Sequence, residues 1–250
     1  MFRGTVWAGL LMAGFIATPA VAQTPPSNAV TTPTSGPSAT VTPDERTSLF
    51  SIDLSLAAVS DYRFRGISLS NKDPAFQPSV TLTHKSGVYA SVWGSNIADN
   101  GGDNIELDLV GGYSRQTGVV SYGINATYYL YPGASGLNYV EFIGNVGTNV
   151  GSAKVGMTFG YVPKQKNVGD QDNVYVAVNG NVPIKGTPLS LTGSFGIEDG
   201  AFGSAKRDWS VGVNADVAGF TLGISYIDTA RTGLNSLGDP TAVFSISRVF

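Results

Sequence analysis

The sequence predicts an all-β fold, a transmembrane antiparallel up-and-down β-barrel of about 12 strands, with short periplasmic turns and longer extracellular loops. Three observations predict it. After about residue 48, apolar and polar residues alternate with a period of two. The connections between the alternating segments are short and long in turn. The last residue, Phe250, is aromatic and in phase with the apolar side of the final segment.

The N-terminal segment, residues 1–22, has the pattern of a secretory signal peptide. Arg3 precedes an apolar run from Val6 to Ile16, and the small residues Ala20-Val21-Ala22 stand before Gln23. The run is too short for a transmembrane helix, which needs about 20 residues. We therefore expect residues 1–22 to be cleaved and the protein to be exported.

Residues 23–47 are rich in Thr, Pro, Ser and Ala and contain few large apolar side chains. Such a segment buries too little surface to offset the entropy lost on ordering, so we expect a disordered tether. A role in docking a partner is the alternative. The remaining residues, 48–250, are long enough for one barrel domain.

The overall composition excludes some classes of function. The formal net charge is −3 at pH 7, and there is no cysteine. This mild acidity argues against nucleic-acid binding, which uses a basic surface. Without cysteine, an exported domain has no disulfides and depends on strand pairing and packing.

The first alternating segment begins at residue 50. In FSIDLSLAAVS, Phe50, Ile52 and Leu54 lie on one face, and Ser51 and Asp53 lie on the other. This spacing predicts a strand with one apolar and one polar face.

The same phase continues into SDYRFRGISLS, residues 60–70. It places Tyr62 and Phe64 on the apolar face and Arg63 and Arg65 on the polar face. We therefore predict that this stretch is the far end of the first strand, in unbroken register.

Later segments repeat the pattern with Gly, Ser, Thr or Asn on the second face. The clearest are NIELDLVGGY (104–113), YGINATYYL (122–130), KVGMTFGY (154–161) and VYVAVNGNV (174–182). In VYASVWGSNI (88–97) both faces carry apolar groups, so its phase is ambiguous. The strand count is therefore fixed only to within about two.

The connections alternate in length. The short ones are 84–87, 115–118, 150–153, 183–188 and 216–219, and the long ones are 61–74, 98–103, 131–138, 163–173, 198–208 and 228–240. Bacterial outer-membrane barrels have this alternation. A soluble β-sandwich is the alternative, but it has no reason to alternate loop lengths so regularly. An even strand count places both termini at the short-turn side.

The C-terminal segment TAVFSISRVF places Ala242, Phe244 and Ile246 in phase with Phe250. It resembles the signal by which outer-membrane proteins are recognised for assembly. We expect the barrel-assembly machinery to bind through Phe250, and outer-membrane lipids and lipopolysaccharide to surround the barrel. The alternative is an ordinary edge strand that ends in Phe.

Four stretches, VSDYRFRGISLSNKDPAFQPSV, GVYASVWGSNI, NIELDLVGGY and YYLYPGASGLNYVE, resemble the TorF family of proteobacterial porins. The resemblance covers about residues 49–250 and is most specific through Glu141. It implies a porin-like channel in the cell outer membrane of a Gram-negative bacterium but no particular solute. We expect passive diffusion of small polar or charged solutes. The alternative is a non-conducting barrel that binds a partner or surface ligand through its loops.

If the apolar phase faces lipid, several charged residues point into the barrel. The pore-lining candidates are Asp53, Arg63, Arg65, Glu106, Asp108, Glu141 and Lys154. The two arginines lie on one predicted strand, and the Glu106–Asp108 pair lies on another. Such facing rows of opposite charge would orient solutes in a constriction. The alternatives are that these charges pair across the interior, or that the arginines lie above the membrane and bind lipopolysaccharide phosphates.

Several aromatic residues are candidates for the interfacial girdles. They are Tyr62, Phe64, Tyr89, Trp93, Tyr113, Tyr128, Tyr161, Trp209 and Tyr226. Tyr129 and Tyr131, in the opposite phase, either form a stacking surface for a ring-bearing solute or fill space.

No residue pattern indicates an enzyme. His84 is the only histidine and stands beside a predicted short turn. A zinc site needs several His or Cys ligands, and a hydrolase elbow needs GxSxG, which is absent. We therefore expect no catalytic residues, no cofactor and no metal.

Overall fold

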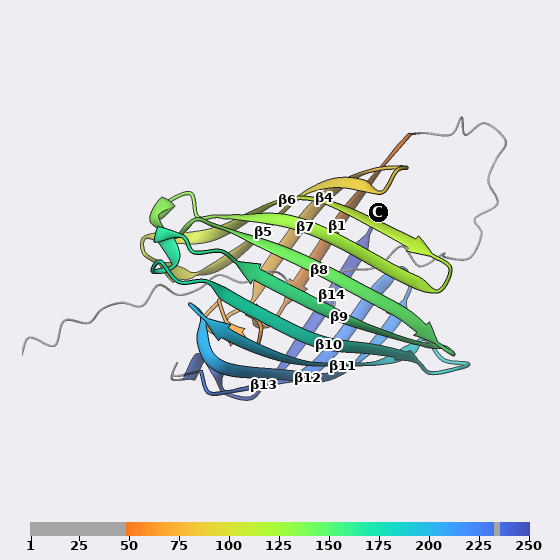
Figure 1. Ribbon diagram of the computed structural model, residues 1–250. Helices are drawn as coiled ribbons and strands as arrows, with labels where there is room; N and C mark the ends of the chain where they lie inside the picture. Colours follow the sequence, from red (N-terminus) through yellow and green to blue (C-terminus); the bar gives the residue numbers. More distant parts are fainter. Residues whose placement is uncertain (1–48, 233–235) are drawn as a thin grey trace, which may run out of the picture.

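The computed structural model describes residues 49–232 and 236–250, and these form a closed antiparallel barrel of twelve strands (Figure 1). Each barrel strand pairs with its neighbours in chain order, and β1 also pairs with β14, which closes the sheet. The predicted fold class and strand number are confirmed. The predicted signal peptide and tether lie outside the described residues.

The barrel strands are β1 (Phe50–Val59), β4 (Ala75–His84), β5 (Val88–Asn100), β6 (Asp103–Thr117), β7 (Val120–Leu130), β8 (Tyr139–Val150), β9 (Ala153–Val162), β10 (Asn173–Pro183), β11 (Leu189–Gly200), β12 (Gly203–Val217), β13 (Phe220–Ala230) and β14 (Thr241–Val249). A separate small hairpin consists of β2 (Arg63–Phe64) and β3 (Ile67–Ser68). Three short 3-10 helices, η2 (Ser135–Leu137), η3 (Lys166–Val168) and η4 (Ser236–Gly238), lie in connections.

The alternation of side chains matches the predicted phase. Ile52 is 69% exposed, Ile124 60% and Val211 59%, so large apolar residues cover the outer wall. Within the described part of the chain, no helix has the length and apolar character needed to cross a bilayer. A closed barrel with an apolar outer wall satisfies all its backbone groups internally, which is what a lipid environment requires. The fold is therefore that of a transmembrane β-barrel.

The two ends of the barrel differ in their connections. All five predicted short connections are tight turns, and we call this the short-turn end, which lies to the right in Figure 1. The opposite end is the long-loop end. Phe250 and Leu54 exchange backbone hydrogen bonds of 2.9 and 3.3 Å, and Phe50 pairs with His84 beside a short turn. The described chain therefore enters and leaves the barrel at the short-turn end, as predicted.

Two predicted long loops, 98–103 and 198–208, are not loops. β5 runs to Asn100 and β6 resumes at Asp103, while β11 and β12 are separated only by residues 201–202. The polar residues in these segments extend the strands because their side chains point into the barrel, where Glu198 pairs in register with Lys206. Polar composition indicated a loop, but the residues are strand residues with a polar interior to face.

The predicted continuation of the first strand through SDYRFRGISLS is also wrong. β1 ends at Val59, and the chain then folds back as the β2–β3 hairpin. Arg65 (φ 45°) and Gly66 (φ 83°) form the two-residue turn of this hairpin, with positive φ at both positions as a type I′ turn requires. An added side chain at Gly66 would also meet Thr229 of β13. The stretch therefore enters the barrel interior instead of extending its wall.

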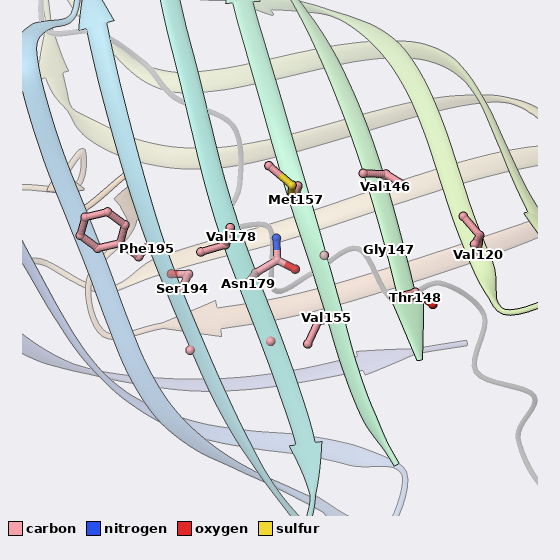
Figure 2. A pocket seen from close by; sticks show the side chains of 13 residues that line it. Val120, Val146, Gly147, Thr148, Val155, Met157, Val178, Asn179, Ser194 and Phe195 are labelled. Carbon is pink, nitrogen blue, oxygen red and sulfur yellow. The ribbon is translucent and has the colours of Figure 1, made fainter. Parts of the chain in front are cut away.

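The outer wall carries a shallow apolar groove of roughly 750 Å³ over β7–β11 (Figure 2). Gly180 and Gly193 pair across β10 and β11 in the outward phase, so no side chain fills the wall there. Val155, Met157 and Phe195 flank them. The groove is part of the lipid-facing surface of the barrel.

The assignment of faces can be tested with two neighbouring residues in the middle of β12. Val211→Arg places a cation on the outer wall, which costs about 2–4 kcal/mol near the bilayer midplane. Ser210→Arg places the same cation in the interior, where water is accessible. We expect Val211→Arg to reduce assembly into membranes, measured by heat-modifiable migration on gels, and Ser210→Arg to assemble normally. Equal yields of the two folded barrels would contradict the assignment.

Candidate functional site

The β2–β3 hairpin lies inside the barrel at the long-loop end, and its tip reaches the far wall. The Arg65 guanidinium contacts Glu141 of β8 and Glu198 of β11, each at 2.5 Å. It also lies over the rings of Phe64 and Tyr175, at 4.5 and 4.1 Å from the ring centroids. One side chain at the hairpin tip therefore joins three strands of the opposite wall.

Lys206 of β12 supports the same tip. Its ammonium lies 2.7 Å from Glu198 Oε2 and donates a hydrogen bond of 2.9 Å to the backbone carbonyl of Arg65. Both Lys206 and Glu198 are fully buried. The hairpin is thus held through its backbone as well as through its arginine.

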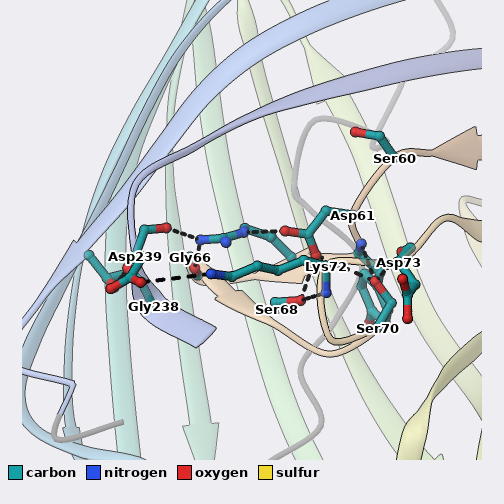
Figure 3. A network of polar contacts seen from close by, with 12 residues as sticks. Ser60, Asp61, Gly66, Ser68, Ser70, Lys72, Asp73, Gly238 and Asp239 are labelled. Carbon is teal, nitrogen blue, oxygen red and sulfur yellow. Dashed lines mark hydrogen bonds and ion pairs between the residues drawn. The ribbon is translucent and has the colours of Figure 1, made fainter. Parts of the chain in front are cut away.

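The base of the hairpin is organised by Asp61 (Figure 3). Its carboxylate accepts hydrogen bonds from Arg63 Nε at 2.7 Å and from Ser68 Oγ at 2.6 Å. Arg63 Nη1 donates to the carbonyls of Gly66 at 3.0 Å and of Asp239 at 2.7 Å, which ties the hairpin to the β13–β14 connection. These bonds explain why the chain turns inward at residue 61.

Tyrosines donate hydrogen bonds to acidic residues of β6 and β8. Glu106 of β6 accepts hydrogen bonds of 3.0 Å from the hydroxyls of Tyr62 and Tyr131. Both tyrosines lie in connections, and burial, together with the charge of Glu106, raises the pKa of each hydroxyl well above its usual value. They therefore stay protonated and donate. Tyr129 donates to Glu141 at 2.9 Å.

Asp108 is different from these acids. It is 1% exposed, and neither of its carboxylate oxygens accepts a hydrogen bond from the residues that the structure describes. In register, it lies opposite Trp93 of β5 and Tyr129 of β7. On the other side of the barrel, Asp208 of β12 accepts from Tyr175 at 3.1 Å with one oxygen, while its Oδ2 has no partner in the described part of the chain.

The structure brings five of the seven predicted candidates together around the hairpin and leaves two apart. Asp53 and Lys154 are exposed residues in the inward phase near the short-turn end. The other five are buried, namely Arg63, Arg65, Glu106, Asp108 and Glu141.

The predicted facing rows of opposite charge are not present. Arg63 pairs with Asp61 and Arg65 with Glu141 and Glu198, so neither arginine pairs with the two acids of β6. The alternative in which the arginines bind lipopolysaccharide phosphates does not fit their contacts, because both are buried in the barrel and paired with carboxylates. The alternative of pairing across the interior describes them best.

Three important residues of the site were missed by the sequence analysis. Glu198, Lys206 and Asp208 fall in the segment that was predicted to be a loop. Their spacing of two, at 206 and 208, was the available signal for inward-facing strand residues. Nothing in the sequence pairs them with residue 65.

The aromatic predictions divide between the two faces. Tyr113, Tyr128, Tyr161, Trp209 and Tyr226 are in the outward phase, as a girdle requires. Tyr62, Phe64, Tyr89 and Trp93 are in the interior, so their assignment to a girdle is wrong. Tyr129 and Tyr131 are fully buried against the hairpin, so they fill space and orient carboxylates.

The short-turn half of the interior is more open and is lined mainly by uncharged polar groups, with Asp53, Lys154 and Asp216 near its end. Inward-facing residues of intermediate exposure there include Thr81, Ser91, Asn125, Asn145, Asn179, Thr192 and Asn214. Some pair across strands, as Thr81 does with Ser91 at 2.8 Å. On β12, inward residues change from buried at Lys206 to exposed at Asp216. Among the residues with described positions, no group of His, Cys, Asp or Glu is arranged to hold a metal ion.

The contribution of the hairpin tip can be measured with Arg65→Met. This change leaves Glu141 without its cation and Glu198 with only one, and breaking a buried ion pair costs about 3–5 kcal/mol. We expect a lower midpoint of unfolding in denaturant for the barrel in lipid vesicles. Arg115→Met, at an exposed position of the short-turn end, is the matched control and should leave the midpoint unchanged. If both variants unfold like the original protein, the tip does not stabilise the barrel.

Solved structures with a similar fold are porins. The NanC porin superposes with a TM-score of 0.52 at 10% identity, covering 80% of this chain and 98% of that chain. The KdgM porin, solved in complex with disordered oligogalacturonate, superposes with a TM-score of 0.51 at 10% identity, covering 79% of this chain and 96% of that chain. At this sequence identity the structural similarity shows the fold, which is that of an outer-membrane barrel. We therefore place the protein in the outer membrane.

Sequence comparison identifies the family. No curated protein is significantly similar to the chain. A family model described as "Bacterial protein of unknown function (Gcw_chp)" matches residues 44–250, which includes the whole barrel. The narrower resemblance to the TorF porins stays a prediction. The chain, a bacterial outer-membrane barrel of twelve strands, belongs to the Gcw_chp family.

Proposed function

We propose that this protein is a porin-like channel for small polar or charged solutes, with the β2–β3 hairpin as its constriction. The observation that carries the proposal is the content of the barrel interior. Charged side chains are buried around the hairpin, and uncharged polar side chains line the more open half below it. Such an interior suits the transport of solutes and not catalysis.

The interior charges are not needed to hold a barrel together. Buried ion pairs contribute little to stability compared with well-packed apolar residues of the same volume. A plug with only a structural role would therefore be more stable with an apolar core. Charged side chains that surround a narrow lumen instead serve to select solutes.

The twelve-strand barrel has an intermediate width. Barrels of about 8 strands are filled by their own side chains, whereas those of 16–18 strands leave an open channel. In this chain the hairpin fills the long-loop half, and the short-turn half retains a polar vestibule. We propose a passage that is wide at the short-turn end and narrow at the hairpin.

The second candidate is a non-conducting barrel that binds a partner or surface ligand through its loops. The observation that favours it is the completeness of packing around the hairpin, where Tyr62, Tyr129 and Tyr131 are each at most 1% exposed. In that case the hairpin is a fixed plug. The two functions differ in a single measurable quantity, the conductance.

The measurement is single-channel recording of the refolded protein in a planar bilayer. We expect discrete conductance steps, because water and ions pass the hairpin. Heat-modifiable migration of the same sample confirms that the barrel is folded. A folded barrel that inserts steadily and conducts no current would favour the plugged, ligand-binding function.

Shortening the hairpin tests its role as the constriction. The backbone N–H of Leu69 donates to the carbonyl of Tyr62 at 2.8 Å, so residues 63–68 can be replaced by a pair of glycines while the base of the hairpin is kept. We expect larger conductance steps, because the charged tip no longer crosses the lumen. Steps of unchanged size from a folded barrel would place the constriction elsewhere.

A further inference from the structure

The acids inside the barrel outnumber the bases. In the described part of the chain, seven carboxylates are buried, namely Asp61, Asp103, Glu106, Asp108, Glu141, Glu198 and Asp208. Only Arg63, Arg65 and Lys206 are buried cations, so the acids exceed the bases by four. The four ion pairs among these buried groups use only Asp61, Glu141 and Glu198. Within the described residues, Glu106 and Asp108 take part in no ion pair.

Asp108 is the most unusual member of this group. Both its oxygens are buried and accept no hydrogen bond from any described residue. A buried polar group without a partner costs about 1–3 kcal/mol, and more if it is charged. A carboxylate in that position therefore lacks the cation or donor that would satisfy it. Its neighbour Glu106 adds to the deficit, since only two neutral tyrosine hydroxyls bind it.

Asp108 and Asp208 lie on opposite walls at the boundary between the packed and the open interior. β6 and β12 are six strands apart in the ring of twelve. On β6, the inward residues beyond Asp108 toward the short-turn end are Val110 and Gly112, both partly exposed. On β12, Ser210 follows Asp208 in the same way. Each aspartate is thus the first buried charge that a solute meets on its strand when it comes from the vestibule.

The walls beside Asp108 also suit a cation. Its partners in register are Trp93 and Tyr129, two aromatic residues whose rings also contact Tyr62 and Tyr139. Aromatic faces attract cations, and they do so more strongly when water is excluded. An anion would meet two aspartate oxygens without partners among the described residues, and Arg65 is already paired with two carboxylates.

We infer that the channel selects small cationic solutes, and that Asp108 and Asp208 bind them at the inner face of the hairpin. This inference rests on the proposed function as a channel. The KdgM porin was solved in complex with oligogalacturonate, an acidic oligosaccharide. The solutes that we infer for this chain have the opposite charge. The excess of buried carboxylates in this chain opposes the entry of such a polyanion.

The test is the reversal potential of single channels across a gradient of potassium chloride. We expect the sign that indicates K⁺ preference in the original protein. Asp108→Asn and Asp208→Asn keep the side-chain shape and remove the charge, so each should lower the permeability ratio of K⁺ to Cl⁻ by roughly half or more. The double variant should bring the ratio close to one.

Asp216→Asn is the matched control. Asp216 is an exposed, inward-facing residue of the same strand β12 near the short-turn end. Its charge is screened by water and salt, so its removal should leave the ratio unchanged. Heat-modifiable migration of every variant checks that the barrel has folded, and loss of an unpaired buried charge is not expected to impair folding.

The outcomes separate the two proposals. Absence of conductance in the original protein rejects the channel function itself. Conductance without K⁺ preference, or with a preference that both asparagine variants retain, rejects the selection of cations while the channel function stands. In particular, a preference unaffected by Asp108→Asn and Asp208→Asn would mean that these acids are held protonated and bind no cation.

Discussion

Closure of the backbone hydrogen-bond ladder is the constraint on which the rest of the structure depends. An unpaired backbone N–H or C=O group in hydrocarbon costs several kcal/mol, so a sheet in a membrane can have no open edge. The pairing of β1 with β14 removes the last edge. Once the ladder is closed, each strand has one face toward lipid and one toward an enclosed interior, and the period of two in the sequence follows from it.

Closure also creates a volume that must be either filled or hydrated. In the short-turn half, uncharged polar side chains line a partly open interior. In the long-loop half, the chain supplies its own filling by folding residues 60–74 inward. Asp61 fixes the base of this hairpin, and the positive φ angles at Arg65 and Gly66 fix its turn. The filling carries charge, and its two arginines are paired with carboxylates of the hairpin base and of the barrel wall.

The contacts of Arg65 show how a charged side chain can help to fill the interior. An arginine has five donors in a planar fork, so a single side chain at a hairpin tip can serve two carboxylates and lie against two aromatic rings. This gives the narrow hairpin an attachment to β8 and β11 without a large apolar core. The charge of the arginine is thus balanced by these acids, whereas Asp108 and Asp208 take part in no ion pair among the described residues.

The sequence by itself determined the barrel, the phase of most strands and the end at which the described chain enters and leaves, because these depend on a local alternation that each strand carries independently. Only the tertiary structure decided the path of SDYRFRGISLS. On paper its alternation continues that of β1, but Arg65 and Gly66 form an inward turn, and the partners of Arg65, Glu141 and Glu198, lie far away in the chain. The same holds for Glu198 and Lys206, whose polarity indicates a loop until a closed interior exists for them to face. Ion pairs across a lumen join residues separated by more than 70 positions, so their geometry is set by closure of the barrel and not by any local pattern.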